Sequence, residues 1–145
     1  MRSVFEAIKM FTGLRPQSIS GSSAVNGLAV DTFGFNSGVV TVGVGAATGT
    51  PTSYTVAGKV QESADGSTNW ADVPNTLPNQ LFTIAADNTS AQIQIEGLGT
   101  SRKRYLRVVV TPAFTGGTSP TVPITSVFGL GRAFKKPVSN STTPA

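Results

Sequence analysis

The stretch Ala91-Gln92-Ile93-Gln94-Ile95-Glu96 alternates apolar and polar residues without a break. Successive side chains of a β-strand point to opposite faces of the sheet. We therefore expect both isoleucines to face a core, and the glutamines and Glu96 to face outward. The stretch 105–111 (Tyr-Leu-Arg-Val-Val-Val-Thr) is the richest in β-branched residues and is expected to form a central strand.

Six further segments have a β composition and are bounded by Gly, Pro, Asn or Asp. They are residues 28–33, 39–44, 54–62, 70–73, 81–85 and 124–128. No helical pattern lies between these strands, which argues against a parallel α/β sheet and for an antiparallel β-sandwich. The expected fold is all-β, and an eight-stranded jelly roll fits the strand count best. An immunoglobulin-like sandwich is the alternative that periodicity cannot separate from it.

The two ends of the chain have a different composition. Ser3 and Glu6 have the spacing of a helix capping box, and apolar residues recur at helical intervals as far as Phe11, before Gly13. Residues 16–27 are polar and rich in Gly and Ser, as in a linker. The expected organisation is an N-terminal arm with a short helix and linker (1–27), a β-sandwich domain (28–128) and an extended C-terminal arm (129–145).

The chain has 145 residues, of which 39% are hydrophobic and only 12% are charged. About 25% charged residues is typical of a soluble domain, and a surface that meets a partner needs fewer. Residues 1–96 carry four basic and seven acidic residues, a net charge of −3, whereas residues 97–145 carry seven basic and no acidic residues, a net charge of +7. This asymmetry favours docking on an acidic surface.

The chain contains neither histidine nor cysteine. These two absences remove disulfides, the usual zinc ligands and the His-based and Cys-based catalytic pairs. We therefore expect no enzyme activity, no cofactor and no metal site. No apolar run approaches the ~18 residues of a membrane span, and Glu6 and Lys9 interrupt any signal-peptide core, so no membrane partner is expected.

Two features of residues 65–72 have both a functional and a simpler structural explanation. Asp65, Ser67, Asn69 and Asp72 group oxygen ligands as a calcium loop does, but the pattern is more typical of a hairpin connection. Trp70 could stack on a ligand, but its position favours a core anchor. Four phenylalanines are likewise expected to be core anchors, namely Phe33, Phe35, Phe82 and Phe114.

The densest basic cluster is Arg102-Lys103-Arg104. Arg107 is expected to point to the opposite face from Arg104, so the bases need not form one patch. Nucleic-acid binding normally needs exposed aromatic residues among the bases, and only Tyr105 is adjacent. A contact with an acidic protein surface explains the cluster, and no nucleic-acid partner is expected.

Two stretches carry a resemblance to a known family. Residues 60–73 (Val-Gln-Glu-Ser-Ala-Asp-Gly-Ser-Thr-Asn-Trp-Ala-Asp-Val) resemble a hairpin of small structural proteins of tailed bacteriophages. Residues 104–112, followed by Gly116-Gly117 and a closing strand into Gly129, are similar to the continuation of that pattern. The family is that of capsid decoration, or cement, proteins. The resemblance implies a homo-oligomer, with a trimer favoured over a dimer, that binds the major capsid protein on the capsid surface of the virion and is assembled in the host cytoplasm.

The family has no catalytic residues to transfer, so the expected contact residues follow from charge and from the two arms. The expected partner-binding residues are Val4, Phe5, Ile8, Phe11, Arg102, Lys103, Arg104, Arg132, Phe134, Lys135 and Lys136. Deletion of residues 1–15 or 129–145 is expected to abolish attachment while the sandwich still folds. The alternatives are another component of the same particle (tail, neck or fibre) and a carbohydrate-binding module that uses Trp70 and Tyr54.

Overall fold

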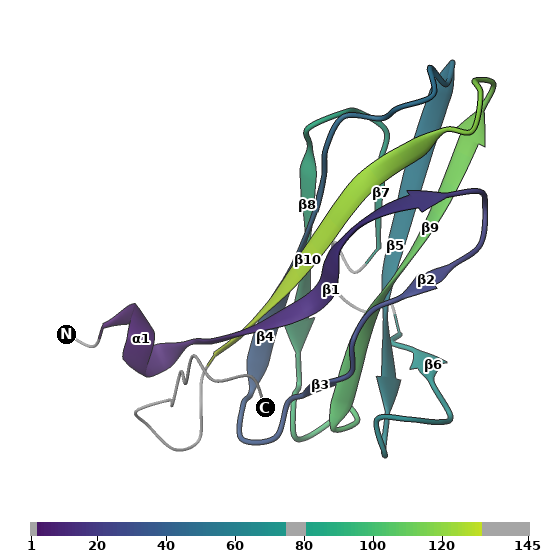
Figure 1. Ribbon diagram of the computed structural model, residues 1–145. Helices are drawn as coiled ribbons and strands as arrows, with labels where there is room; N and C mark the ends of the chain where they lie inside the picture. Colours follow the sequence, from purple (N-terminus) through teal and green to yellow (C-terminus); the bar gives the residue numbers. More distant parts are fainter. Residues whose placement is uncertain (1–2, 75–80, 132–145) are drawn as a thin grey trace.

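A computed structural model describes residues 3–74 and 81–131 of the chain (Figure 1). These residues form one short helix and ten strands. In chain order the elements are α1 (Val4–Ala7), β1 (Lys9–Ser20), β2 (Val25–Asn26), β3 (Val30–Asp31), β4 (Ser37–Val44), β5 (Ser53–Ser63), β6 (Ala71–Asp72), β7 (Phe82–Ile84), β8 (Ser90–Glu96), β9 (Tyr105–Thr115) and β10 (Thr121–Gly131).

The strands form two sheets that lie face to face (Figure 1). The first sheet has the order β1-β10-β4-β8. The second has the order β2-β9-β5-β6, with β3 also paired to β9 and β7 also paired to β5. Every strand pair is antiparallel. The predicted all-β antiparallel sandwich is therefore confirmed.

Strand pairing is nested along the chain. The first strand pairs with the last, β2 and β3 pair with β9, β4 pairs with β8, and β5 pairs with β6 and β7. The described residues thus hold ten strands where eight were predicted. The two additional strands, β1 and β2, fall in the segment that was predicted to be an arm.

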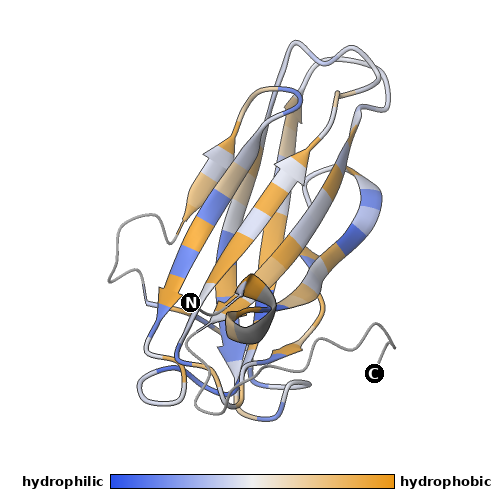
Figure 2. Cartoon of the chain, turned by 90° about the vertical axis from the view of Figure 1, so that its left-hand side faces the viewer, coloured by the Kyte–Doolittle hydropathy of each residue, from blue (hydrophilic) through white to orange (hydrophobic). Residues whose placement is uncertain are grey.

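The core lies between the sheets and is built by period-two alternation, which is visible as alternating colours along the strands in Figure 2. Ile93 and Ile95 are 1% and 2% exposed, whereas Gln92, Gln94 and Glu96 are exposed, as predicted. The central strand β9 contributes Leu106, Val108 and Val110, all fully buried.

The prediction of an N-terminal arm over residues 1–27 is wrong. The helix ends at Ala7, and β1 begins at Lys9 and pairs with β10 as far as Ser20. Pairing with β10 turns Leu14 and Ile19 inward, where they are 2% and 3% exposed. Irregularities in the register on either side of Leu14 let a strand that contains glycine and proline follow the sheet edge, where proline is tolerated.

The C-terminal boundary also moves, because β10 continues to Gly131 and Leu130 is fully buried. Residues 129–131 therefore belong to the sandwich, and residues 132–145 lie outside the described part of the chain. Deletion of residues 1–15 would remove the buried Leu14, and deletion of residues 129–145 would remove the buried Leu130. Either truncation is therefore expected to destabilise the sandwich as well as to affect attachment.

Candidate functional site

One end of the sandwich collects the segments that carry the candidate residues (Figure 1). We call it the terminal end: residues 31–37, 62–71 and 96–105, together with the start of β1 and the finish of β10. Backbone hydrogen bonds tie these segments together, from Asn36 to Gly131 (3.3 Å), from Leu98 to Asn36 (3.1 Å) and from Thr32 to Arg104 (3.0 Å). Candidate residues that are far apart in the sequence thus share one end of the molecule.

The two ends of the sandwich differ in charge. The three loop segments of the terminal end contain seven charged residues, namely Asp31, Glu62, Asp65, Glu96, Arg102, Lys103 and Arg104. The connections at the opposite end, residues 45–52, 85–89 and 116–120, contain only Asp87. Charged side chains in the described loops are therefore concentrated at the terminal end.

Arg104 is held in a fixed position at this end. Its guanidinium donates two hydrogen bonds to Asp31, from Nε to Oδ1 (2.9 Å) and from Nη2 to Oδ2 (2.8 Å). It also lies 5.0 Å from the centre of the Phe33 ring and 5.3 Å from that of Tyr105, within range of a cation–π contact. The hydrogen bond from Arg104 lowers the pKa of Asp31, and the same bond raises the pKa of Arg104. The four side chains form a pre-organised cluster, which we call the Phe33–Arg104 stack.

Phe33 is 76% exposed, so its prediction as a core anchor is wrong. A tight turn explains the exposure, since the Phe35 N–H donates to the Thr32 carbonyl (3.1 Å) and Gly34 adopts a φ of 90°. This turn places Phe35 in the core at 8% exposure and leaves Phe33 outside. The Phe33 N–H donates to Asp31 Oδ1 (3.0 Å), which fixes the turn to the stack. The sequence carries no periodic signal for this arrangement, because the two aromatic residues lie two positions apart in a turn.

Arg102 and Lys103 differ in accessibility. The Arg102 side chain is 13% exposed and its Nη1 lies 3.9 Å from Glu62 Oε2. The Lys103 backbone N–H donates to the same oxygen (3.0 Å), while the Lys103 side chain is exposed. Of the three consecutive bases, only Lys103 and Arg104 present their side chains to solvent. Glu62 and Asp31, from the acidic first part of the chain, thus lie beside Arg102 and Arg104, from the basic second part. Opposite charges that are separated in the sequence are neighbours in the structure.

Arg107 lies away from this cluster, on the outer face of the second sheet. It donates from Nε (3.0 Å) and Nη2 (2.7 Å) to Gln61 Oε1 and lies 4.4 Å from the centre of the Trp70 ring. Burial lowers the pKa of Arg107. Trp70 is half-buried beneath this guanidinium and is not part of the core between the sheets, so its prediction as a core anchor is wrong. The other two phenylalanines of that prediction, Phe82 and Phe114, are partly buried and pack against the core.

The loop that resembled a calcium site is closed on itself. The Asp65 carboxylate accepts the N–H groups of Ser67 (2.9 Å) and Thr68 (2.8 Å) and the hydroxyls of Ser63 and Thr68. Hydrogen bonds, that from the Thr68 hydroxyl first, hold the pKa of Asp65 well below its usual range. Within residues 3–74 and 81–131, no three His, Cys, Asp or Glu side chains are grouped so that they could hold a metal ion. The loop is a self-capped hairpin connection.

The two aromatic residues of the carbohydrate-binding alternative do not come together. Tyr54 is 8% exposed and its hydroxyl donates to Asp87 Oδ1 (2.8 Å) at the opposite end of the sandwich. Burial, reinforced by that bond, raises the pKa of Tyr54 to about 12. Trp70 lies at the terminal end, so the pair offers no common platform for a sugar.

The N-terminal candidates lie beside the terminal end. Val4 on α1 is 70% exposed and Ile8 is 37% exposed. Phe11 is instead a strand residue, paired with Phe128 and partly buried against the core, with the Lys9 ammonium 5.1 Å from its ring centre. The five remaining candidates, which are the Phe5 side chain, Arg132, Phe134, Lys135 and Lys136, lie outside the described residues.

No protein-family model matches the chain, and no similar sequence is found among curated proteins. In the described part of the chain, no helix has the length and apolar character that crossing a membrane requires.

Proposed function

We propose that this protein is a structural component of a phage virion that attaches to the outer surface of the head and ties neighbouring subunits of the major capsid protein together. It acts without catalysis and as a homo-oligomer, a trimer in preference to a dimer. The sequence resemblance supplies the particle and the partner. The exposed Phe33–Arg104 stack is the observation that carries the docking role.

The nested strand pairing supports this proposal at the level of the fold. In a jelly roll the first strand pairs with the last strand, the second strand with the second-last, and so on towards the middle of the chain. The strands of this protein pair in the same way, and jelly rolls are found in viral capsid domains. We infer that β2 and β3 are two pieces of one jelly-roll strand, and β6 and β7 two pieces of another. The ten observed strands then reduce to the eight of a jelly roll.

The Phe33–Arg104 stack has the properties of a binding hot spot. Arginine and aromatic residues are enriched among residues that dominate interface energies, and immobilised side chains lose little entropy when a partner binds. Phe33 offers an apolar ring to a pocket, while the Arg104 guanidinium retains donors that Asp31 does not take. Repetition of such a contact around a symmetric shell would multiply a moderate affinity.

Binding to purified heads tests the proposal. Phe33→Ala is expected to weaken cosedimentation with heads that lack the protein by about thirtyfold, the effect of a 2 kcal/mol hot spot. Leu81→Ala is the matched control, since Leu81 is also an exposed apolar residue (56%) but lies outside the terminal end. Unchanged binding of Phe33→Ala would remove the stack from the proposal. Electron microscopy of labelled protein on whole particles decides between head and tail, neck or fibre, and mass measurement in solution decides the oligomeric state.

A further inference from the structure

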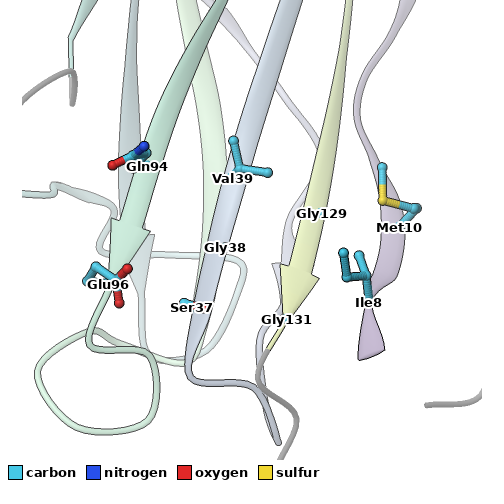
Figure 3. A pocket seen from close by; sticks show the side chains of 9 residues that line it. All are labelled: Ile8, Met10, Ser37, Gly38, Val39, Gln94, Glu96, Gly129 and Gly131. Atoms are coloured by element: carbon cyan, nitrogen blue, oxygen red, sulfur yellow. The ribbon is translucent and has the colours of Figure 1, made fainter. Parts of the chain in front are cut away.

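The outer face of the first sheet carries a groove beside the terminal end (Figure 3). Its volume is about 520 Å³, and β1, β4, β8 and β10 all contribute to its lining. Ile8, just before β1, and Met10 on β1 form one side. Gln94 and Glu96 on β8 form the other side, and Val39 on β4 lies between the two sides (Figure 3). The groove thus has an apolar side and a polar, acidic side.

Two glycines of β10 shape the groove. At Gly129 a Cβ atom would lie 3.2 Å from Met10 Sδ and 3.4 Å from Val39 Cγ1, so these side chains approach each other above the glycine. Gly131 also lines the groove, and among the described residues the nearest atom to a Cβ there would be the Ala7 carbonyl oxygen, at an ordinary contact distance of 3.9 Å. The groove therefore reaches Gly131, the residue from which the chain continues.

Charge complementarity indicates what fits this groove. Glu96 is the only charged residue among the described residues that line it, and it forms no salt bridge with any of them. Met10 is 59% exposed. An occupant that places an apolar side chain against Met10 and a cation beside Glu96 would satisfy both sides.

The chain itself contains such a segment directly after Gly131, which lines the groove. Residues 132–145 begin directly after Gly131 and contain Phe134, followed by Lys135 and Lys136, with Arg132 before it and no acid. An extended chain advances about 3.3 Å per residue, so this segment has ample length to turn back into the groove. Its direct attachment also gives it an effective concentration in the millimolar range.

We propose that the groove is the seat of the chain's own C-terminal segment, with Phe134 packed against Met10 and the lysine pair beside Glu96. This seat is independent of the Phe33–Arg104 stack. It shields the most exposed apolar side chain of β1 and pairs Glu96.

The methyl group of Met10 reports on the seat in NMR spectra, since the chain has only two methionines and Met10→Ala assigns the signal. In a chain that ends at Gly131, the Met10 signal is expected to differ from that of the full chain. Adding a peptide of residues 132–145 should restore the signal in a saturable way. The same peptide should leave the signal of the full chain unchanged, because that seat is occupied.

Two variants with equal changes in net charge test the acidic side. Glu96→Gln is expected to weaken peptide binding about threefold, as for an exposed ion pair. Gln92→Lys also raises the net charge by one, but Gln92 lies on the same face of β8 outside the groove, and the affinity should stay close to that of the unmodified chain. If the shortened chain fails to fold, the full chain with Lys135→Glu and Lys136→Glu serves in its place, because its own segment should leave the seat and admit the unmodified peptide.

A Met10 signal that is identical in full and shortened chains and insensitive to the peptide would overturn the proposal. A full-chain signal that depends on protein concentration would also overturn it, since the occupant would then be the segment of a second copy.

Discussion

Leu14 distinguishes a β1 strand that belongs to the core from an arm that merely precedes it. Its side chain is 2% exposed in the interior of the sandwich, and its backbone pairs with Ser126 on β10. Ser18 lies four residues later on the same strand and is exposed. Leu14→Ala and Ser18→Ala therefore form a pair that differs in burial and not in strand.

The expected magnitudes follow from burial. Replacement of a fully buried leucine by alanine costs about 2–5 kcal/mol in free energy of unfolding, from lost transfer energy and from the cavity left behind. Replacement of an exposed side chain changes it by less than about 0.5 kcal/mol. For a domain of this size each kcal/mol corresponds to a shift of about 4 °C in Tm. Leu14→Ala should thus lower Tm by about 8–20 °C, and Ser18→Ala by about 2 °C or less.

Thermal unfolding followed by the fluorescence of Trp70 is the assay. Trp70 is the only tryptophan and lies on the second sheet beneath Arg107, remote from Leu14 on the first. If β1 is part of one cooperative core, Leu14→Ala shifts the midpoint seen by this distant reporter. A Trp70 midpoint that is the same in Leu14→Ala and Ser18→Ala would refute the reasoning, because β1 would then detach without unfolding the sandwich.

Three further predictions concern single contacts. A Cβ at Gly58 would overlap the Phe82 ring, so Gly58→Ala should lower the free energy of unfolding in urea by about 1–3 kcal/mol. Gly43→Ala is the control and should be close to neutral, because no atom lies within 4 Å of a Cβ at Gly43. Equal effects of the two substitutions would contradict this packing. The hydrogen bond from Arg104 lowers the pKa of Asp31, so the ion pair should stabilise the fold above pH 3.8 and lose this contribution as the pH falls through the lowered value. A stability difference between the unmodified chain and Asp31→Asn that does not shrink on acidification below pH 3.8 would count against the pair. Deprotonation of Tyr54 should raise the phenolate absorbance only near pH 12, because its pKa is raised to about 12. Tyr54→Phe should therefore remove an absorbance change near pH 12 from a spectrophotometric titration. If Tyr54→Phe instead removes an absorbance change near pH 10, the Tyr54 hydroxyl is exposed.

Much of the strand content could be predicted from local sequence. Alternation in residues 91–96 predicted which side chains of β8 are buried, and the β-branched run 105–111 predicted the central strand β9, which extends to Thr115 in the structure. Turn residues placed the hairpin at Asp65, whose carboxylate caps its own loop. These features depend on neighbours within a few residues, so the sequence alone was sufficient.

The candidate site was predicted only in part, because its contacts join distant residues. Arg104 was selected from its charge, but its partner Asp31 is 73 residues away and acquires its role only when β3 pairs with β9. Exposure of Phe33 depends on a turn whose geometry has no periodicity. Local patterns could therefore suggest the basic cluster but not the stack.

The sequence by itself determined an antiparallel sandwich, the inward face of most strands and the lack of histidine and cysteine chemistry, since composition and alternation are local properties. Only the tertiary structure decided that β1 is a strand, where the domain ends and which charges meet. The physical reason is that β1 has little β signal of its own. β1 becomes a strand because its backbone pairs with the hydrogen-bonding edge of β10, which lies more than a hundred positions away in the sequence, and because Leu14 is buried in the core.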